Sequence, residues 1–375
     1  MRRMLLLVAV ALLVSSSRAQ DAYVSKVQIG VFGLFHPHEL TLQALPGQAV
    51  VLHAGRETLI LDGSGQANVA RLILSEGKIA IDNDGRITAA LEIRAGSRSG
   101  EAADFVLAVP GKIQRHYRGT LLVKAHGETL IPVVSMDLET AVASAVQAES
   151  PPEAPLEALK AQAVASRSYF VAGAGRHEDF DFCDTTHCQF LREPSAKNSL
   201  AAVAAAQTRG LILSYNEHTF APMFTRSCGG QTQTAHEIGL AASSYPYFSV
   251  VCKFCREHPV HWQAHLSQNE AEELRSKGES ARLDIDRRLG WSTVLSNNFT
   301  TRKDAASRDG SMVVVEGIGQ GHGAGLCQLG SKAMAENGAG FQEILEHYYP
   351  NTKLREISSV RMTNRTRPTI SPSGN

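Results

Sequence analysis

The sequence has no surplus of charge of either sign, because 37 Lys and Arg residues stand against 37 Asp and Glu residues. A chain without a basic excess has no electrostatic reason to bind nucleic acid. Cysteine is scarce too, and six among 375 residues are too few for a fold built from disulfides. Nucleotide motifs are missing as well: the glycine-rich stretch GQGHGAGLCQLG (319–330) has neither a GK[ST] ending nor a GxGxxG register.

Long apolar runs are also missing, apart from one at the start of the chain. Residues 4–14 are apolar, follow Arg2 and Arg3, and precede the small-residue sequence Ser17-Arg18-Ala19. The run is too short to span a bilayer, so it predicts a signal peptide over residues 1–19 and a periplasmic or secreted mature protein. A retained membrane anchor is the alternative, and we expect no stable anchor. Three of the 37 basic side chains would leave with the peptide, so 34 would face 37 acidic ones.

What the chain does contain is first a β-rich region, residues 20–116. Short runs of Val, Ile and Leu, such as QAVVLHA and ETLILDG, end in Gly, Asp or Asn, as meandering antiparallel strands do. The run 119–137 continues as a hairpin with its turn at His126-Gly127. This region has no charged cluster with metal or acid/base spacing, so we interpret it as a β scaffold.

After residue 137, the spacing of apolar residues changes from that of a strand to that of a helix. Apolar residues recur every three or four positions from Leu138 to Val146, and Ser150-Pro151-Pro152 ends this helix. A second helix begins at Pro155 and runs to Gly173. Strands are expected within 211–232 and 311–319, helices over 267–278 and 325–338, and a disordered tail over 363–375. The pattern predicts an α+β fold.

Glu149 lies eleven residues after Leu138, almost three helical turns, and therefore on the apolar stripe of the first helix. A carboxyl there loses hydration, so its pKa should rise, as a general acid requires near neutral pH. Lys160 and Arg167 are seven residues apart on the next helix, and two aligned cations could balance the carboxylate or hold a sugar. The alternative is a helix-terminal glutamate in water with two solvated cations.

The stretch HEDFDFCDTTHCQF (177–190) holds two histidines and two cysteines. His177, Cys183, His187 and Cys188 are suitable zinc ligands, although their spacing is not that of a common zinc finger. A disulfide between Cys183 and Cys188 is the alternative in an exported chain. Four protein ligands would leave no open position, so such a zinc would be structural rather than a water activator.

Glycines in 319–330 let the backbone approach a ligand closely, with His322 on the turn. We predict that His322 contacts substrate beside Glu149, and that Gln328 lies on the same surface. Cys327 could be a nucleophile with His322 as its base, but a packed helical cysteine is favoured. The Cys252-x-x-Cys255 pair has no thioredoxin-like context, which disfavours a redox centre.

Five ordered motifs resemble the SpoIID/LytB family, the stage II sporulation protein D group of peptidoglycan-acting proteins. They are PLEALKAQAVASRSY (155–169), FDFCDTTHCQF (180–190), SCGGQT (227–232), GHGAGLCQLGSKAMAENG (321–338) and ILEHYYPNT (344–352). The resemblance implies a SpoIID-like catalytic core over residues 117–362 that follows the β-rich N-terminal region.

The resemblance also implies site residues. The family's essential glutamate lies eleven residues before the lysine of the ALKAQ motif, which is Glu149 here. The lysine and arginine of that motif are Lys160 and Arg167. The family's zinc ligands correspond to His177, Cys183, His187 and Cys188, which favours a structural zinc over the disulfide.

The implied activity is that of a lytic transglycosylase, which cleaves the bond between N-acetylmuramic acid and N-acetylglucosamine in peptide-stripped glycan and leaves a 1,6-anhydro product. One carboxylate serves both proton transfers, so no second acid is needed. The alternative is a non-catalytic wall-binding protein that enhances an amidase, which would be a partner. An amide hydrolase using Cys327 or zinc is disfavoured, because the predicted zinc is fully ligated.

Two features depart from the family pattern. Ser150 stands where Met is expected after the glutamate. Cys228, Cys252, Cys255 and Cys327 form a second set that many members lack, and disulfides, a second zinc site and free thiols all remain open for it.

Overall fold

The computed structural model describes residues 25–65, 68–83, 86–239, 245–307 and 310–359. The predicted signal peptide (1–19) and disordered tail (363–375) lie outside the described residues. Helices and strands are both present, so the α+β prediction is confirmed. Within the described part of the chain, no helix is both long enough and apolar enough to cross a bilayer.

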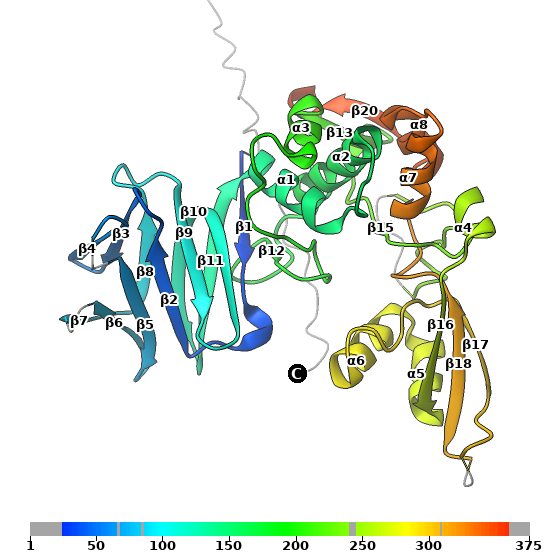
Figure 1. Ribbon diagram of the computed structural model, residues 1–375, viewed down its shortest axis with the longest axis horizontal. Helices are drawn as coiled ribbons and strands as arrows, with labels where there is room; N and C mark the ends of the chain where they lie inside the picture. Colours follow the sequence, from blue (N-terminus) through cyan, green and yellow to red (C-terminus); the bar gives the residue numbers. More distant parts are fainter. Residues whose placement is uncertain (1–24, 66–67, 84–85, 240–244, 308–309, 360–375) are drawn as a thin grey trace, which may run out of the picture.

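The N-terminal half forms a curled, largely antiparallel sheet of twelve strands (Figure 1). Its strands are β1 (Lys26–Gly30), β2 (Glu39–Ala44), β3 (Ala49–Ala54), β4 (Glu57–Asp62), β5 (Val69–Ser75), β6 (Lys78–Asn83), β7 (Arg86–Ala90), β8 (Glu92–Gly96), β9 (Ala103–Val109), β10 (Ile113–His126), β11 (Thr129–Asp137) and β12 (Phe182–Cys183). A short 3-10 turn, Gly33–Phe35, follows β1.

Strand β10 holds the two arms of this sheet together. Its first half pairs with β9, and its second half pairs with β11 on one side and β8 on the other. Gly119 lies where the partners change, and a Cβ there would come within 2.4 Å of the Ser135 carbonyl oxygen. Because β10 runs through residues 116 and 117, the predicted domain boundary falls inside a strand. The β-rich region and the predicted core therefore share one sheet.

The helices begin where the period of the sequence changes. They are α1 (Leu138–Glu149), α2 (Leu156–Ala172), α3 (Leu200–Gln207), α4 (Lys253–Glu257), α5 (Gln268–Lys277), α6 (Glu279–Leu289), α7 (Gln328–Glu336) and α8 (Phe341–Tyr348). Asp137 caps α1 by accepting hydrogen bonds from the backbone N–H groups of Glu139 (3.0 Å) and Thr140 (3.2 Å). The predicted helix ends at Pro155 and Gly173 match the caps of α2.

Smaller sheets complete the fold. Their strands are β13 (Leu211–Tyr215), β14 (His218–Thr219), β15 (Phe224–Thr225), β16 (His261–Ser267), β17 (Phe299–Lys303), β18 (Met312–Ile318), β19 (Leu326–Cys327) and β20 (Lys353–Glu356), followed by the 3-10 turn Ile357–Ser359. The sheet β16-β18-β17 packs against α5 and has its own core around Leu266. Figure 1 shows it and the twelve-stranded sheet at opposite ends of the molecule, with α1–α3 and α7–α8 near the top.

One core joins the large sheet to the first helices. It includes Leu42 and Val123 from the sheet, Val142 and Val146 from α1, and Phe170 from α2, all fully buried. A second core lies between α2, α7 and α8 and contains four cysteines. Glu149 is the last residue of α1.

Candidate active site

The Glu149 carboxyl is partly buried at the last position of α1, on the stripe that buries Leu138, Val142 and Val146. Its Oε1 atom accepts a hydrogen bond of 2.7 Å from the backbone N–H of Phe190. Burial raises the pKa of Glu149 to about 7, although the Phe190 N–H, Arg226 and Gln328 act in the opposite direction. A carboxyl in this state can both give and take a proton near neutral pH.

Three separate segments supply the neighbours of Glu149. Phe190 comes from the loop after β12, Arg226 directly follows β15, and Gln328 is the first residue of α7. Arg226 also donates from Nη1 to the Glu149 backbone carbonyl, at 3.4 Å. Gln328 is buried, hydrogen-bonds the Glu149 side chain and donates to the side-chain oxygen of Gln162.

Sequence reasoning placed Gln328 near Glu149, where the structure has it, but missed Phe190 and Arg226. A substrate contact for Gln328 stays a prediction. Phe190 acts through its backbone, which no residue-type argument reveals. Arg226 carried one signal: it lies two residues before Cys228, as Phe190 lies two residues after Cys188. The cysteines therefore mark the segments that surround the glutamate.

The structure contradicts the predicted position of Arg167. From the sequence, this residue was expected to lie with Lys160 beside the carboxyl of Glu149. Its side chain is completely buried and forms a two-pronged ion pair with Glu139, at 2.9 and 2.7 Å. It also donates to the carbonyls of Ala205 and Leu211 and to the Thr208 hydroxyl, so every N–H direction has a partner. The prediction that Arg167 binds substrate is wrong, and its role is to join α1, α2 and α3.

Lys160 lies on a different side of α2 from Gln162, since two residues correspond to roughly 200° of helix rotation. Its ammonium forms an ion pair of 2.6 Å with Glu157 and lies 5.9 Å from the centre of the Phe341 ring. Lys160 therefore faces α8, and the cation near Glu149 is Arg226 instead. A glycan contact for Lys160 stays a prediction.

His322 has a different charged environment from Glu149. It is partly buried, and its Nδ1 accepts a hydrogen bond from the Ala324 N–H at 3.1 Å. Burial lowers the pKa of His322, and the nearby Arg282 charge lowers it further. The Glu279 carboxylate acts in the opposite direction and raises this pKa. Its closest charges thus come from α6, and its proposed place beside Glu149 stays a prediction.

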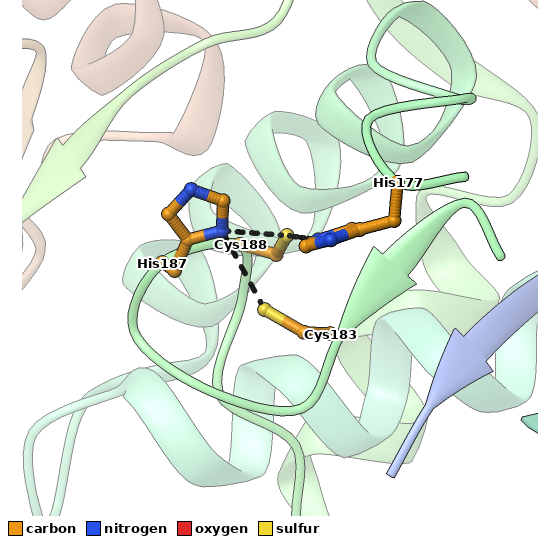
Figure 2. A group of neighbouring side chains, drawn as sticks. All are labelled: His177, Cys183, His187 and Cys188. Atoms are coloured by element: carbon orange, nitrogen blue, oxygen red, sulfur yellow. Dashed lines mark hydrogen bonds between the residues drawn. The ribbon is translucent and has the colours of Figure 1, made fainter. Parts of the chain in front are cut away.

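The four residues of the histidine–cysteine cluster, namely His177, Cys183, His187 and Cys188, point toward one another (Figure 2). All four candidate ligand atoms lie within 4.8 Å of each other. His177 Nε2 is 3.3 Å from Cys188 Sγ, and His187 Nδ1 is 3.7 Å from Cys183 Sγ and 3.6 Å from Cys188 Sγ. Both cysteines are free thiols in the structure, so the disulfide alternative is not the arrangement observed.

These separations fit a tetrahedral zinc ion. With Zn–S bonds of about 2.3 Å and Zn–N bonds of about 2.1 Å, a tetrahedron places sulfur and nitrogen ligands roughly 3.6 Å apart. The observed nitrogen–sulfur separations of 3.3–3.7 Å lie close to that value. Two sulfurs and two imidazole nitrogens are also a usual zinc donor set.

The loop that carries this cluster is tied to the large sheet. Strand β12 pairs with β1, and buried Asp184 forms an ion pair of 2.9 Å with Arg115 from β10. Burial raises the pKa of Asp184, which Arg115 opposes. The Arg115 guanidinium also lies 5.5 Å from the centre of the Phe190 ring. The β-rich region thus supports the loop whose Phe190 N–H holds Glu149.

Cys327 adjoins this site, since it directly precedes Gln328 and its sulfur lies 3.9 Å from the Arg226 carbonyl oxygen. Cys327 is fully buried, with its sulfur 3.4 Å from that of Cys255, which argues against a nucleophile served by His322. A hollow of about 560 Å³ on the sheet β16-β18-β17 is lined by residues 261–263, 298–300 and 316–318. The residues bonded to Glu149, namely Phe190, Arg226 and Gln328, are not among those that line this hollow.

Comparison with known proteins gives the family. Residues 126–215 match the SpoIID family, described as stage II sporulation protein. This match supports the assignment of the segment 126–215 to the SpoIID family. The matched span includes Glu149, Phe190 and the histidine–cysteine cluster, and ends before Arg226 and the second cysteine set.

Three relatives illustrate the match. An uncharacterized protein of Brachyspira hyodysenteriae is 28% identical over 273 residues, covering 65% of this chain and 73% of that protein. Stage II sporulation protein D of Bacillus subtilis is 26% identical over 271 residues, covering 60% and 77%. The amidase enhancer of Bacillus subtilis is 26% identical over 286 residues, covering 55% of this chain and only 39% of the enhancer.

Proposed function

We propose that this SpoIID-family protein acts in cell-wall processing as a lytic transglycosylase of peptidoglycan glycan strands, with Glu149 as its acid and base. The observation that carries the proposal is the Glu149 carboxyl itself. Burial raises its pKa to about 7, and one backbone N–H steadies the oxygen that bears the charge when the proton leaves. The matches to the SpoIID family and to stage II sporulation protein D support a cell-wall role.

In the first step, protonated Glu149 gives its proton to the glycosidic oxygen between N-acetylmuramic acid and N-acetylglucosamine, and the bond from muramic C1 to that oxygen breaks. In the second step, the Glu149 carboxylate takes the proton from the muramic 6-hydroxyl while that oxygen bonds to C1. The 1,6-anhydro ring closes, the proton is recovered and no water is consumed.

The neighbours of Glu149 suit these two steps. After the first transfer the carboxylate is ionised, and the Phe190 N–H at 2.7 Å and the nearby Arg226 charge stabilise it. Burial works in the other direction and keeps the acid form available near neutral pH. Gln328 would orient the carboxyl or contact the sugar, and His322 is proposed as a further glycan contact.

A structural zinc ion is part of the proposal. His177, Cys183, His187 and Cys188 would hold it, and no position would remain for substrate. Because Cys188 lies two residues before Phe190, the ion would fix the loop that donates to Glu149. Its contribution would be to folding and to the placement of that N–H group.

The location and partners belong to the same proposal. Glycan strands lie outside the cytoplasm, in agreement with the signal peptide predicted over residues 1–19. Balanced charge gives no support for a nucleic-acid partner. We propose that stem peptides are removed before cleavage, so the preferred substrate would be bare glycan.

A second candidate function is favoured by one of the relatives, which is named an amidase enhancer. In that case the protein would bind wall material and accelerate a partner amidase without cutting glycan. The two functions differ in their products. Cleavage leaves anhydromuramyl ends, whereas enhancement leaves none of its own and increases the amount of free stem peptide made by the amidase.

The test is Glu149→Gln, with Glu153→Gln as the matched control, since Glu153 is an exposed carboxyl four residues away. We expect the wild type and Glu153→Gln to release anhydromuramyl products from peptide-stripped glycan. Glu149→Gln should release at least about a hundredfold less while still binding glycan. Products are counted by mass spectrometry on intact and stripped peptidoglycan.

Glu149→Gln protein that cuts at the wild-type rate would contradict the mechanism. Wild-type protein that never cuts, yet accelerates an amidase, would establish the enhancer function instead.

A further inference from the structure

The cysteines that the family match leaves out form a second group, the four-cysteine cluster of Cys228, Cys252, Cys255 and Cys327. All four are buried, and their sulfur atoms all lie within 4.8 Å of one another. They come from three segments: the loop after β15, the start of α4 and the residue before α7. A stretch of about a hundred residues therefore folds to bring four sulfurs to one point.

The arrangement fits one ion better than two disulfides. A disulfide brings two sulfurs to about 2.05 Å from each other and does not require a second pair of sulfurs nearby. Around a single zinc ion, each sulfur lies about 3.8 Å from three others, because Zn–S bonds are about 2.3 Å. Here each thiol has the other three as neighbours, all four are free, and Cys255 and Cys327 are 3.4 Å apart. An iron–sulfur cluster would hold its cysteines farther apart.

Hydrogen-bond donors surround the sulfurs, as they do around metal-bound thiolates. The Gly330 N–H donates to Cys327 Sγ at 3.4 Å. The Ser227 hydroxyl is 3.5 Å from Cys255 Sγ, and the Tyr348 hydroxyl is 3.4 Å from Cys252 Sγ. Four neutral buried thiols would pack as small apolar groups and would not need three polar partners.

Close packing beside the cluster explains one glycine. A Cβ at Gly330 would lie 2.0 Å from the Tyr348 hydroxyl oxygen and 2.5 Å from Cys252 Sγ. Only glycine lets the first turn of α7 approach Tyr348 and Cys252, the residue before α4, this closely. The backbone of α7 therefore packs directly against Tyr348 and one cysteine of the cluster.

We propose that the four-cysteine cluster binds one zinc ion as a second structural site, which holds Arg226 and Gln328 beside Glu149. Cys228 lies two residues after Arg226, and Gln328 directly follows Cys327. The Leu329 N–H donates to the Arg226 carbonyl at 3.1 Å, which joins the two segments. One metal site thus positions the Phe190 side of Glu149, and the other positions the Arg226 and Gln328 side.

The test counts zinc and thiols in the full exported chain. Elemental analysis of the wild type should give about two zinc ions per chain. Cys252→Ser/Cys255→Ser and Cys183→Ser/Cys188→Ser should each keep about one. Alkylation in denaturant with chelator and no reductant should modify all six cysteines. When cobalt(II) replaces zinc, the protein should show the visible absorption that is typical of tetrahedral thiolate coordination.

A wild type with one zinc that the Cys183→Ser/Cys188→Ser variant loses would overturn the proposal, as would a disulfide within the four-cysteine cluster or iron in place of zinc. The wild-type zinc count, thiol count and cobalt spectrum keep the test valid if the Cys252→Ser/Cys255→Ser variant does not fold. None of these measurements depends on glycan cleavage, so failure here and failure of the proposed function are distinguishable.

Discussion

The two cysteine clusters on either side of Glu149 differ in their ligands and in their exposure. The histidine–cysteine cluster has an exposed member, His187, and only Cys188 is buried, whereas the four-cysteine cluster is buried throughout. The first lies in a loop at the edge of the large sheet, and the second lies inside a core shared by α2, α7 and α8. Each cluster is proposed to fix a loop beside the carboxyl. Because their burial differs, we expect the two clusters to contribute different amounts to the stability of the fold.

The largest expected effect separates the clusters directly. Cys255→Ser should cost more stability than Cys183→Ser, because it would remove the proposed zinc ion and also disturb a side chain packed inside a hydrophobic core. We expect several kcal/mol for Cys183→Ser and loss of cooperative folding around α7 and α8 for Cys255→Ser. Urea denaturation followed by tryptophan fluorescence and circular dichroism measures both. Equal losses in the two variants would mean that burial does not distinguish the sites.

Substitution of Arg167 provides a stability change that involves no metal ion, since this residue joins α1, α2 and α3. Arg167→Met should cost about 3–5 kcal/mol, because it leaves the Glu139 carboxylate buried without its partner. Lys160→Met is the matched control on the same helix. Its ion pair with Glu157 is partly exposed, so we expect less than about 1 kcal/mol. Zinc content should stay at the wild-type value in both variants.

The same pair tests the sequence prediction for Lys160. Glycan cleavage by Lys160→Met should stay within about twofold of wild type, given that Lys160 faces α8. A large drop in glycan affinity with unchanged stability would restore the predicted substrate contact.

The sequence predicted those parts of the fold that local signals determine. Asp137, the prolines at 151, 152 and 155, and Gly173 set the ends of α1 and α2, and the structure has both helices there. Strands β2 and β9 alternate buried and partly buried residues just as clearly, yet neither strand was predicted from the sequence. RITAALEI proved to be two strands, β7 and β8, with a bend at Leu91 between them.

The site was harder to predict because its neighbours meet only in the tertiary fold. Spacing placed Arg167 on one face of α2, but α2 is rich in alanine and buried on nearly every side, so that face points into the protein. Arg226 and Phe190 come from loops that no periodicity places. Cys228 and Cys327 are about a hundred residues apart in sequence, so only the folded chain shows that they belong together.

The last effect is the pH dependence that Glu149 gives to stability. Its pKa rises from an ordinary 4.5 to about 7 on folding, so the folded state holds the proton more tightly than the unfolded state. The contribution to stability is complete below about pH 4.5 and is lost as pH rises through about 7. At about 1.36 kcal/mol per pKa unit, the loss is at most about 3 kcal/mol.

This effect can be isolated by taking the difference between wild type and Glu149→Gln from pH 4.5 to 8. Loss of zinc in acid would destabilise both proteins alike and would cancel in the difference. Wild type should lose stability relative to Glu149→Gln as pH rises, and Glu153→Gln should follow wild type. Cleavage should fall above about pH 7, because the first step needs the protonated acid. A difference that does not change with pH would show that the carboxyl is ionised throughout, and would remove the observation on which the proposed acid rests.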